Sequence, residues 1–181
     1  PVIHFIMERP NMKKMKRLVA VLLVGIMALA MLTACGVTPS APSMRDTALE
    51  RDVAQWTVEL GRSKSLELTL DSELTEISNK CLPTAVKAVD ARLAFPRDWN
   101  VYDNALKEQK TFFAEAKKGK TAALVPVDFP SEEEVTKKTL ASRKDYIQYK
   151  LNEAGVKNPT KFGVTVTKQK EYTLVLFVVS E

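Results

Sequence analysis

Beyond residue 43, hydrophobic residues first recur at the spacing of an α-helix and later alternate as in β-strands. The first helical set predicts a helix that ends at Gly61, with Ser43 and Asp46, three positions apart, as its candidate capping residues. That set is Leu49, Val53, Trp56 and Leu60. A short alternating run follows at residues 66–70 and predicts an extended segment.

A second helix is predicted to begin after Asp71, whose side chain suits an N-cap. Its apolar face continues past Pro83, which should kink or divide it. The residues of that face are Leu74, Ile77, Cys81, Val86, Val89 and Leu93. Residues 95–99 then predict a loop, and residues 104–118 a third helix that Gly119 ends.

The remaining pattern mixes strands and short helices. Residues 122–129 are apolar, and Pro126 predicts an edge strand there. Ser131 and Glu134 form a capping-box pattern, so a helix is expected from Ser131 onward, followed by a second helix that ends at Gly155. Residues 162–166 and 172–179 predict a C-terminal β-hairpin. Helices dominate early and strands late, which indicates the α+β class.

The segment before residue 44 has the pattern of a secretion signal. A basic cluster at residues 13–17 precedes residues 18–34, which carry no charge. The sequence Leu32-Thr33-Ala34-Cys35 then resembles the lipobox of bacterial lipoproteins, in which the cysteine thiol is lipidated before cleavage. A transmembrane anchor is the alternative, but it needs about 20 apolar residues, and this stretch is shorter and contains Gly and Thr.

This interpretation divides the chain into four parts. Residues 1–11 are an upstream extension before a start at Met12, and residues 12–34 are the signal peptide. Residues 35–43 are the lipidated linker, and residues 44–181 form a single α+β domain. The mature protein is therefore expected outside the cytoplasm, held by its lipid to the cell membrane, or to the outer membrane of a two-membraned cell.

Net charge argues against a nucleic-acid partner. From Cys35 onward the chain has 22 Lys and Arg residues and 21 Asp and Glu residues, so the mature net charge is 22 − 21 = +1. A nearly neutral domain has no general attraction to nucleic acid. The expected partners are the membrane and an envelope ligand or protein.

The mature domain contains no histidine, because the single His4 lies before the lipobox. Histidine-dependent triads and the usual zinc sites are therefore excluded, and neither a cofactor nor a metal is expected. Cys81 has no disulfide partner once Cys35 is lipidated, and a buried thiol is favoured over a nucleophile.

Both ends of the mature domain resemble CAP domains, the superfamily of cysteine-rich secretory, antigen 5 and pathogenesis-related-1 proteins. Residues 49–51 and 68–74 resemble the opening helix and the acid-capped second helix. Residues 141–147 are similar to the family's Ser-x-x-His segment, and residues 162–177 to its closing hairpin. The resemblance implies a three-layer α-β-α sandwich with a small antiparallel sheet and a ligand cleft.

The family's metal-binding histidines are missing. Asp145 stands where the Ser-x-x-His segment would have its histidine, and Ser142 keeps the serine. Ser142, Asp145 and the loop aromatic Trp99 are the candidate cleft residues, although a solvated charge is the favoured interpretation of Asp145, and core packing that of Trp99. The acidic run at residues 132–134 is more simply explained by first-turn helix positions than by metal binding.

Three functions follow as hypotheses. The first is a non-catalytic, CAP-like lipoprotein that binds a ligand or a protein. The main alternative is a structural or assembly lipoprotein on an unrelated small α+β fold. The third is a carboxylate-dependent hydrolase of envelope material that would use Asp71, Asp98, Asp103 or Asp145, whose spacing identifies no catalytic pair.

Overall fold

The computed structural model describes residues 45–181. The expected extension, signal peptide, lipidated Cys35 and linker, residues 1–43, lie outside the described residues. Pro42–Glu181 forms one compact unit by itself. Among the helices of the described part, none has the length and apolarity needed to cross a membrane.

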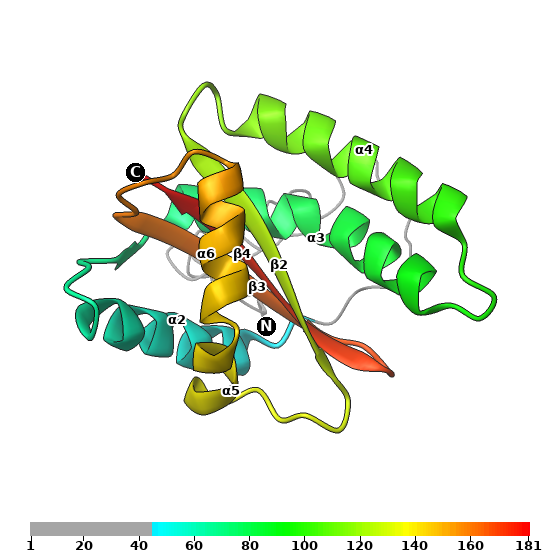
Figure 1. The fold of residues 1–181 in the computed structure, drawn as a ribbon, viewed down its shortest axis with the longest axis horizontal. Coiled ribbons are helices and arrows are strands. Elements are labelled where there is room, and N and C mark those ends of the chain that lie inside the picture. The colour runs from blue at the N-terminus through cyan, green and yellow to red at the C-terminus, as the bar shows by residue number, and fades with distance from the viewer. Residues whose placement is uncertain (1–44) are drawn as a thin grey trace, which may run out of the picture. The chain divides into compact units, whose positions relative to one another are not determined.

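Helices predominate in the first part of the described chain, and the last two elements form a β-hairpin (Figure 1). In chain order the elements are α2 (Thr47–Arg62), β1 (Thr69–Leu70), α3 (Ser72–Leu93), α4 (Trp99–Ala116), β2 (Ala122–Pro130), α5 (Lys137–Ser142), α6 (Lys144–Glu153), β3 (Lys161–Lys168) and β4 (Tyr172–Ser180). The α+β class predicted from the sequence is confirmed.

The four strands form one sheet in the order β1-β3-β4-β2. β4 pairs antiparallel with both β2 and β3, but β1 runs parallel to β3. The expected antiparallel sheet is therefore wrong, and the sheet is mixed. The parallel pair arises because the whole segment from α3 to α6 separates the two strands, whereas a tight turn could only join antiparallel neighbours.

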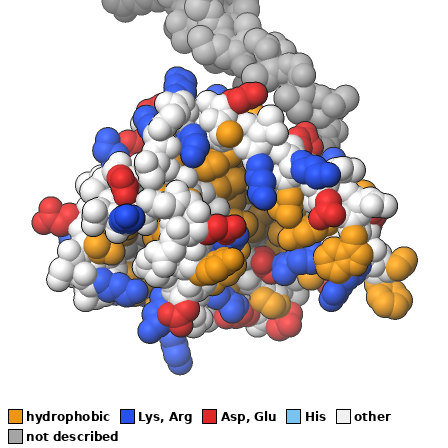
Figure 2. Space-filling view, turned by 45° about the horizontal axis from the view of Figure 1, so that its top comes forward, with side chains coloured by type: hydrophobic (Ala, Val, Ile, Leu, Met, Phe, Trp, Pro, Cys, Tyr) orange, Lys and Arg blue, Asp and Glu red, His pale blue; other side chains and the backbone are white. Residues whose placement is uncertain are grey.

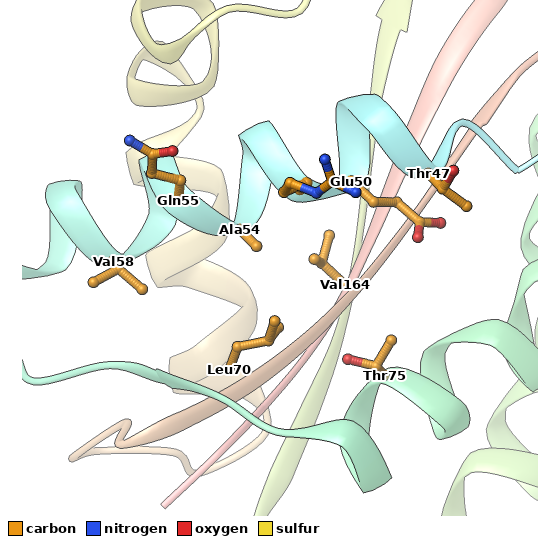
Figure 3. A pocket seen from close by; sticks show the side chains of 9 residues that line it. Thr47, Glu50, Ala54, Gln55, Val58, Leu70, Thr75 and Val164 are labelled. Atoms are coloured by element: carbon orange, nitrogen blue, oxygen red, sulfur yellow. The ribbon is translucent and has the colours of Figure 1, made fainter.

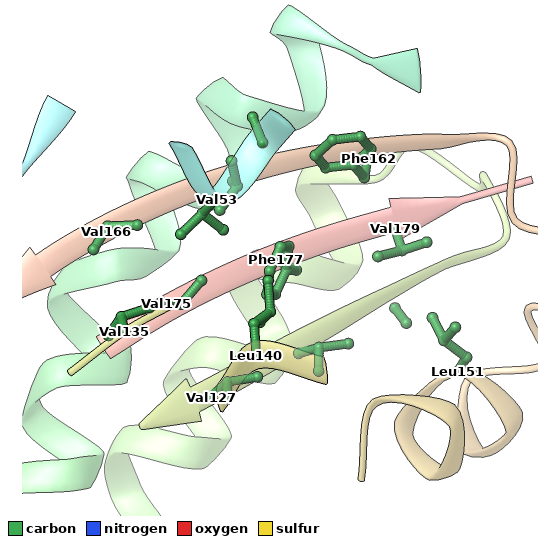
Figure 4. Packing of buried hydrophobic residues seen from close by; sticks show 14 of the residues in the cluster. Val53, Val127, Val135, Leu140, Leu151, Phe162, Val166, Val175, Phe177 and Val179 are labelled. Carbon is green, nitrogen blue, oxygen red and sulfur yellow. The ribbon is translucent and has the colours of Figure 1, made fainter. Parts of the chain in front are cut away.

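Helices cover both faces of the sheet, and each face has its own hydrophobic core. One core packs α2, α5 and α6 against the sheet and includes Val53, Leu140 and Phe177 (Figure 4). The other lies under α3 and includes Cys81 and Leu176, with Phe113 of α4 packed against it. The central strand β4 is buried along its whole length, as expected for a strand covered on both sides.

Pro83 does not divide α3, which is one of the two effects that the sequence predicts for it. The helix runs through Pro83 without a break and is 22 residues long in total. Pro83 lies on the exposed side, while Leu82 before it and Ala85 after it belong to the core between α3 and the sheet. Burial of both halves on one flat surface outweighs the single backbone hydrogen bond that proline removes.

The prediction that a helix starts at Ser131 is wrong. Residues 131–136 are non-helical, and α5 begins only after Thr136, which forms a capping box with Thr139. The Ser131 amide instead donates to the carbonyl oxygen of Glu171, and Glu133 pairs with Arg143 at 2.6 Å. These tertiary contacts hold the segment as a turn followed by irregular chain, although its local pattern favours a helix.

Other local predictions are confirmed. Asp46 and Asp71 cap α2 and α3, each accepting a hydrogen bond from a backbone amide three residues later. β2, which contains Pro126, is an edge strand. Gly155 follows the end of α6 with a φ of 76°, a conformation that glycine adopts without strain.

Candidate functional site: an apolar pocket between α2 and α6

An apolar pocket lies between the end of α2, the helices α5 and α6, and the sheet. Its volume is about 190 Å³. Leucine, isoleucine, valine and phenylalanine side chains form most of its lining: Leu60, Leu66, Leu68, Leu140, Ile147, Leu151, Phe162, Phe177 and Val179. Figure 4 labels Leu140, Leu151, Phe162, Phe177 and Val179 of this lining, which belong to the same core.

Gly61 is the residue of α2 whose missing side chain leaves space for the neighbouring pocket residues. It was expected to end the helix, but α2 continues to Arg62, and Gly61 is buried in the last turn. A Cβ atom at Gly61 would lie 2.9 Å from Leu68 Cδ1 and 3.2 Å from the Leu66 carbonyl oxygen. The glycine therefore allows the chain after α2 to fold back along the helix and to supply two pocket leucines.

Two lysines lie at the edge of this pocket. Lys64, in the turn that follows α2, and Lys144, the first residue of α6, both contribute to its lining. Both side chains are exposed. Neither forms an ion pair with any residue of the described part of the chain. Gln148 and Thr57 are the other polar side chains of the lining. An apolar interior with cationic groups at its edge matches an amphipathic ligand that carries a negative charge.

The size of the pocket limits what it can hold. A dry apolar cavity of about 150 Å³ in another protein binds benzene, whereas pockets for drug-sized ligands have about 300–1,000 Å³. At about 190 Å³, this pocket fits a small apolar group or the end of an acyl chain. The rest of a longer ligand would lie outside it, beside the lysines.

A second hollow of about 440 Å³ lies on the other flank of α2 (Figure 3). Ala54, Val58 and Val164 line it together with the carboxylate of Glu50. That carboxylate accepts hydrogen bonds from Arg45, at 2.6 and 2.8 Å, and from the Val166 amide at 2.9 Å. Because its hydrogen bonds are made within the protein, we assign Glu50 a structural role.

The acidic residues 132–134 line a third, polar hollow together with Asp46 and Asp52. They are not first-turn helix residues as expected, because α5 starts later. Asp46 is occupied as a helix cap and also lies 3.3 Å from Lys168 Nζ. Within the described residues, no three His, Cys, Asp or Glu side chains are grouped so that they could hold a metal.

The three cleft residues suggested by the sequence do not come together in this pocket. Ser142 is exposed and donates to the Thr139 carbonyl oxygen at 2.7 Å, and Asp145 is exposed in the first turn of α6. Trp99 begins α4 and is 53% exposed, so the expected core packing is wrong. None of the three is among the pocket residues.

The reactive groups considered from the sequence have structural positions. Cys81 is fully buried, as expected, and burial raises the pKa of its thiol to about 11. Asp71 and Asp98 cap α3 and α4. The backbone amide of Leu74 holds the pKa of the Asp71 carboxyl below its usual value. Asp71 is therefore ionised near neutral pH, a state unsuited to a general acid.

Sequence reasoning missed the pocket residues. The alternation at residues 66–70 predicts an extended segment, and within it only Thr69 and Leu70 pair with β3. The alternation places Leu66 and Leu68 toward the pocket instead. No local signal shows that they meet Ile147 and Phe162, which are about 80 to 95 positions later in the chain.

Comparisons with protein-family models, with curated proteins and with solved structures gave no match. The function is therefore argued from the site and from the sequence pattern that precedes the domain.

Proposed function

We propose that this protein is a bacterial envelope lipoprotein, held to a membrane by lipid on Cys35, whose domain binds a small anionic amphiphile without chemical conversion. The apolar pocket with Lys64 and Lys144 at its edge is the observation that carries the ligand part of the proposal. The lipobox-like sequence before the domain carries the anchoring part.

The chemistry of the lining supports binding rather than catalysis. The pocket contains no carboxylate, thiol, histidine or tyrosine. Its only groups of a kind used as nucleophiles are the Thr57 hydroxyl and the amines of Lys64 and Lys144, and no carboxylate or histidine of the lining could activate them as a base. Its apolar surface favours a hydrocarbon group, which leaves water when it enters. The two ammonium groups favour a carboxylate, sulfonate or phosphate at the other end of the ligand.

A divergent CAP-like domain remains part of the proposal. Helices on both faces of the sheet and the C-terminal hairpin agree with the architecture that the resemblance implies. The mixed sheet and the exposed position of Asp145 show where this chain would differ from the family expectation. The alternative is a structural or assembly lipoprotein on an unrelated fold, which would bind no small ligand in the pocket.

Calorimetric titration of residues 42–181 with octanoate and with octanol tests the ligand proposal. We expect octanoate to bind and Lys64→Ala/Lys144→Ala to weaken its binding about threefold to tenfold, because each exposed charge pair contributes up to about 1 kcal/mol. Octanol should bind this variant and the unchanged protein equally. Ala141→Leu, which adds volume at the pocket lining, should weaken the binding of both compounds.

Lys110→Ala/Lys138→Ala is the matched control, because it removes two exposed lysines that do not line the pocket. It should bind octanoate like the unchanged protein. A folded domain that binds neither compound would overturn the ligand proposal and favour the structural or assembly alternative. Equal weakening by both lysine pairs would show that the charge at this pocket is not specific.

A further inference from the structure

The loop between α3 and α4 exposes large hydrophobic side chains. Phe95 is 101% exposed, Trp99 53% and Leu93 49%. We call these three residues the aromatic tip. Figure 2 shows hydrophobic side chains projecting from the right-hand end of the surface, the side on which the α3–α4 loop lies in Figure 1. Single exposed hydrophobic residues are common, but three within seven positions form a patch.

Local contacts hold Trp99 in this exposed position. The Arg97 guanidinium lies 5.7 Å from the centre of its ring, and Tyr102 packs edge-on at 5.8 Å. Asp98 caps α4 through the Val101 amide, and its own amide reaches the Ala91 carbonyl oxygen at 3.3 Å. The loop is thus fixed to both helices, with its apolar residues directed outward.

The aromatic tip and the start of the described chain lie at the same end of the sheet. At this end, which we call the hairpin end, Lys168 of β3 pairs with Thr173 of β4. Arg45 forms a bridge with the neighbouring Thr167. The last turns of α3 reach the same end, because Asp90 accepts a hydrogen bond from Tyr172 Oη at 2.8 Å.

The chain between the lipobox and the domain is short. Ten positions separate Cys35 from Arg45, and such a segment spans at most about 33–36 Å when fully extended. A lipid on Cys35 would therefore keep the hairpin end near the bilayer. This placement of the hairpin end rests on the proposed anchoring.

We propose that the aromatic tip inserts into the interfacial region of the lipid bilayer to which the protein is anchored. Tryptophan suits this region because its ring is apolar and its N–H is polar, and phenylalanine and leucine suit the boundary with the acyl chains. Arg97 beside Trp99 can reach the head groups while its methylene groups stay with the apolar part. The domain would then have a fixed orientation on the membrane.

This orientation directs the apolar pocket away from the bilayer. Phe162 and Val179 of the pocket pair with each other at the opposite end of the sheet from the hairpin end. A ligand would therefore enter from the side of the domain that faces the surrounding compartment.

The experiment attaches the domain to vesicles chemically, so that it does not depend on lipidation in the cell. Residues 35–181 are coupled through Cys35 to a maleimide phospholipid in phosphatidylcholine vesicles; Cys81 is fully buried and should not react. Trp56→Phe leaves Trp99 as the only tryptophan. We expect a blue-shifted Trp99 emission and at least twofold quenching by phospholipid brominated near the head group.

A second reporter is the matched control. Trp56→Phe/Trp99→Phe/Tyr149→Trp places the single tryptophan on α6, at a residue that is 61% exposed. Its emission should remain unquenched, and Phe95→Ser should reduce the quenching of Trp99. Equal quenching of the two reporters, or none of Trp99 in a protein with an unchanged melting temperature, would overturn the proposal. Failure of the cellular lipid label on Cys35 would instead concern only the anchoring.

Discussion

At Gly163, the absence of a side chain lets α3 cross β3 at close range. A Cβ atom there would lie 2.1 Å from the backbone carbon of Leu74 and from the backbone nitrogen of Thr75. Both neighbours are backbone atoms of the first turn of α3, so they cannot move aside as a flexible side chain would. The glycine therefore determines how α3 enters its place on the sheet.

We expect Gly163→Ala to lower the free energy of unfolding by about 3 kcal/mol or more, at or beyond the upper end of the usual cost of overpacking. Urea denaturation of residues 42–181 would measure it. Gly61→Ala is the matched control, because its methyl group lies nearest to the movable end of Leu68, its one backbone neighbour is the Leu66 carbonyl oxygen at 3.2 Å, and the helix gains from alanine. It should cost less than about 1 kcal/mol. Similar costs for the two variants would contradict this explanation.

Cys81 shows how burial controls reactivity. Its pKa is raised to about 11 because the thiolate would be desolvated. We expect iodoacetamide to leave the native domain unlabelled at pH 8.5 and to label it fully in concentrated guanidinium chloride. Above about pH 9 the thiol of the unfolded chain ionises, whereas the thiol of the folded chain stays protonated. Ionisation therefore favours the unfolded chain, and the free energy of unfolding should decrease as the pH rises from about 9 to 11. Rapid labelling of the native protein would disprove the buried position.

At the scale of elements, α3 shows that packing can outweigh a helix breaker. Pro83 is exposed and removes the hydrogen bond that residue 83 would donate to the carbonyl of Asn79. We expect Pro83→Ala to raise the free energy of unfolding by about 1–3 kcal/mol, measured by thermal and urea denaturation. Lys80→Ala, at another exposed position, should change it by less than about 0.5 kcal/mol. A destabilised Pro83→Ala would indicate that the sheet requires a bend there.

The carboxylate of Glu50 connects the start of α2 to β3. Glu50 is 8% exposed and accepts hydrogen bonds from Arg45 and from the Val166 amide. Arg45→Ala should lower the free energy of unfolding by about 1–2 kcal/mol, less than the 3–5 kcal/mol of a fully buried pair because the Arg45 side chain is 36% exposed. Combining it with Glu50→Gln should recover part of the loss, since no buried charge then lacks its partner. No recovery in urea denaturation would argue against this ion pair.

Local sequence chemistry accounts for several element boundaries and fails at others. Asp46 and Asp71 cap their helices because a carboxylate and the free amides that follow lie within a few residues of each other. Ser131 has a similar local signal, but its amide is taken by Glu171, which lies 40 positions later. Cap patterns are therefore predictive only where no distant partner competes for the same backbone groups.

For the whole molecule, the proposed lipid attachment at Cys35 is the prediction that bears most on the proposed function. We expect a bacterium that expresses the full chain to incorporate labelled palmitate into it and to hold it in the membrane fraction. Cys35→Ala should abolish the label, whereas Cys81→Ala should retain it because the Cys81 side chain is buried. A label that persists in Cys35→Ala, or no label in the unchanged chain, would contradict the lipoprotein prediction.

The sequence alone determined the local features of this protein. The α+β class, the caps at Asp46 and Asp71, the edge strand at Pro126 and the C-terminal hairpin depend on periodicity and on residues a few positions apart. The proposed anchor likewise rests on a contiguous pattern that ends at Cys35.

Only the tertiary structure decided the rest, because these features depend on contacts between distant segments. The parallel β1–β3 pair joins residues about 90 positions apart, and α3 continues through Pro83 because the sheet supports both of its halves. The pocket is lined by side chains from α2, from the segment between α2 and β1, from α5 and α6, and from the sheet. The sequence provides the hydrophobic residues and lysines, but folding alone places them around one cavity.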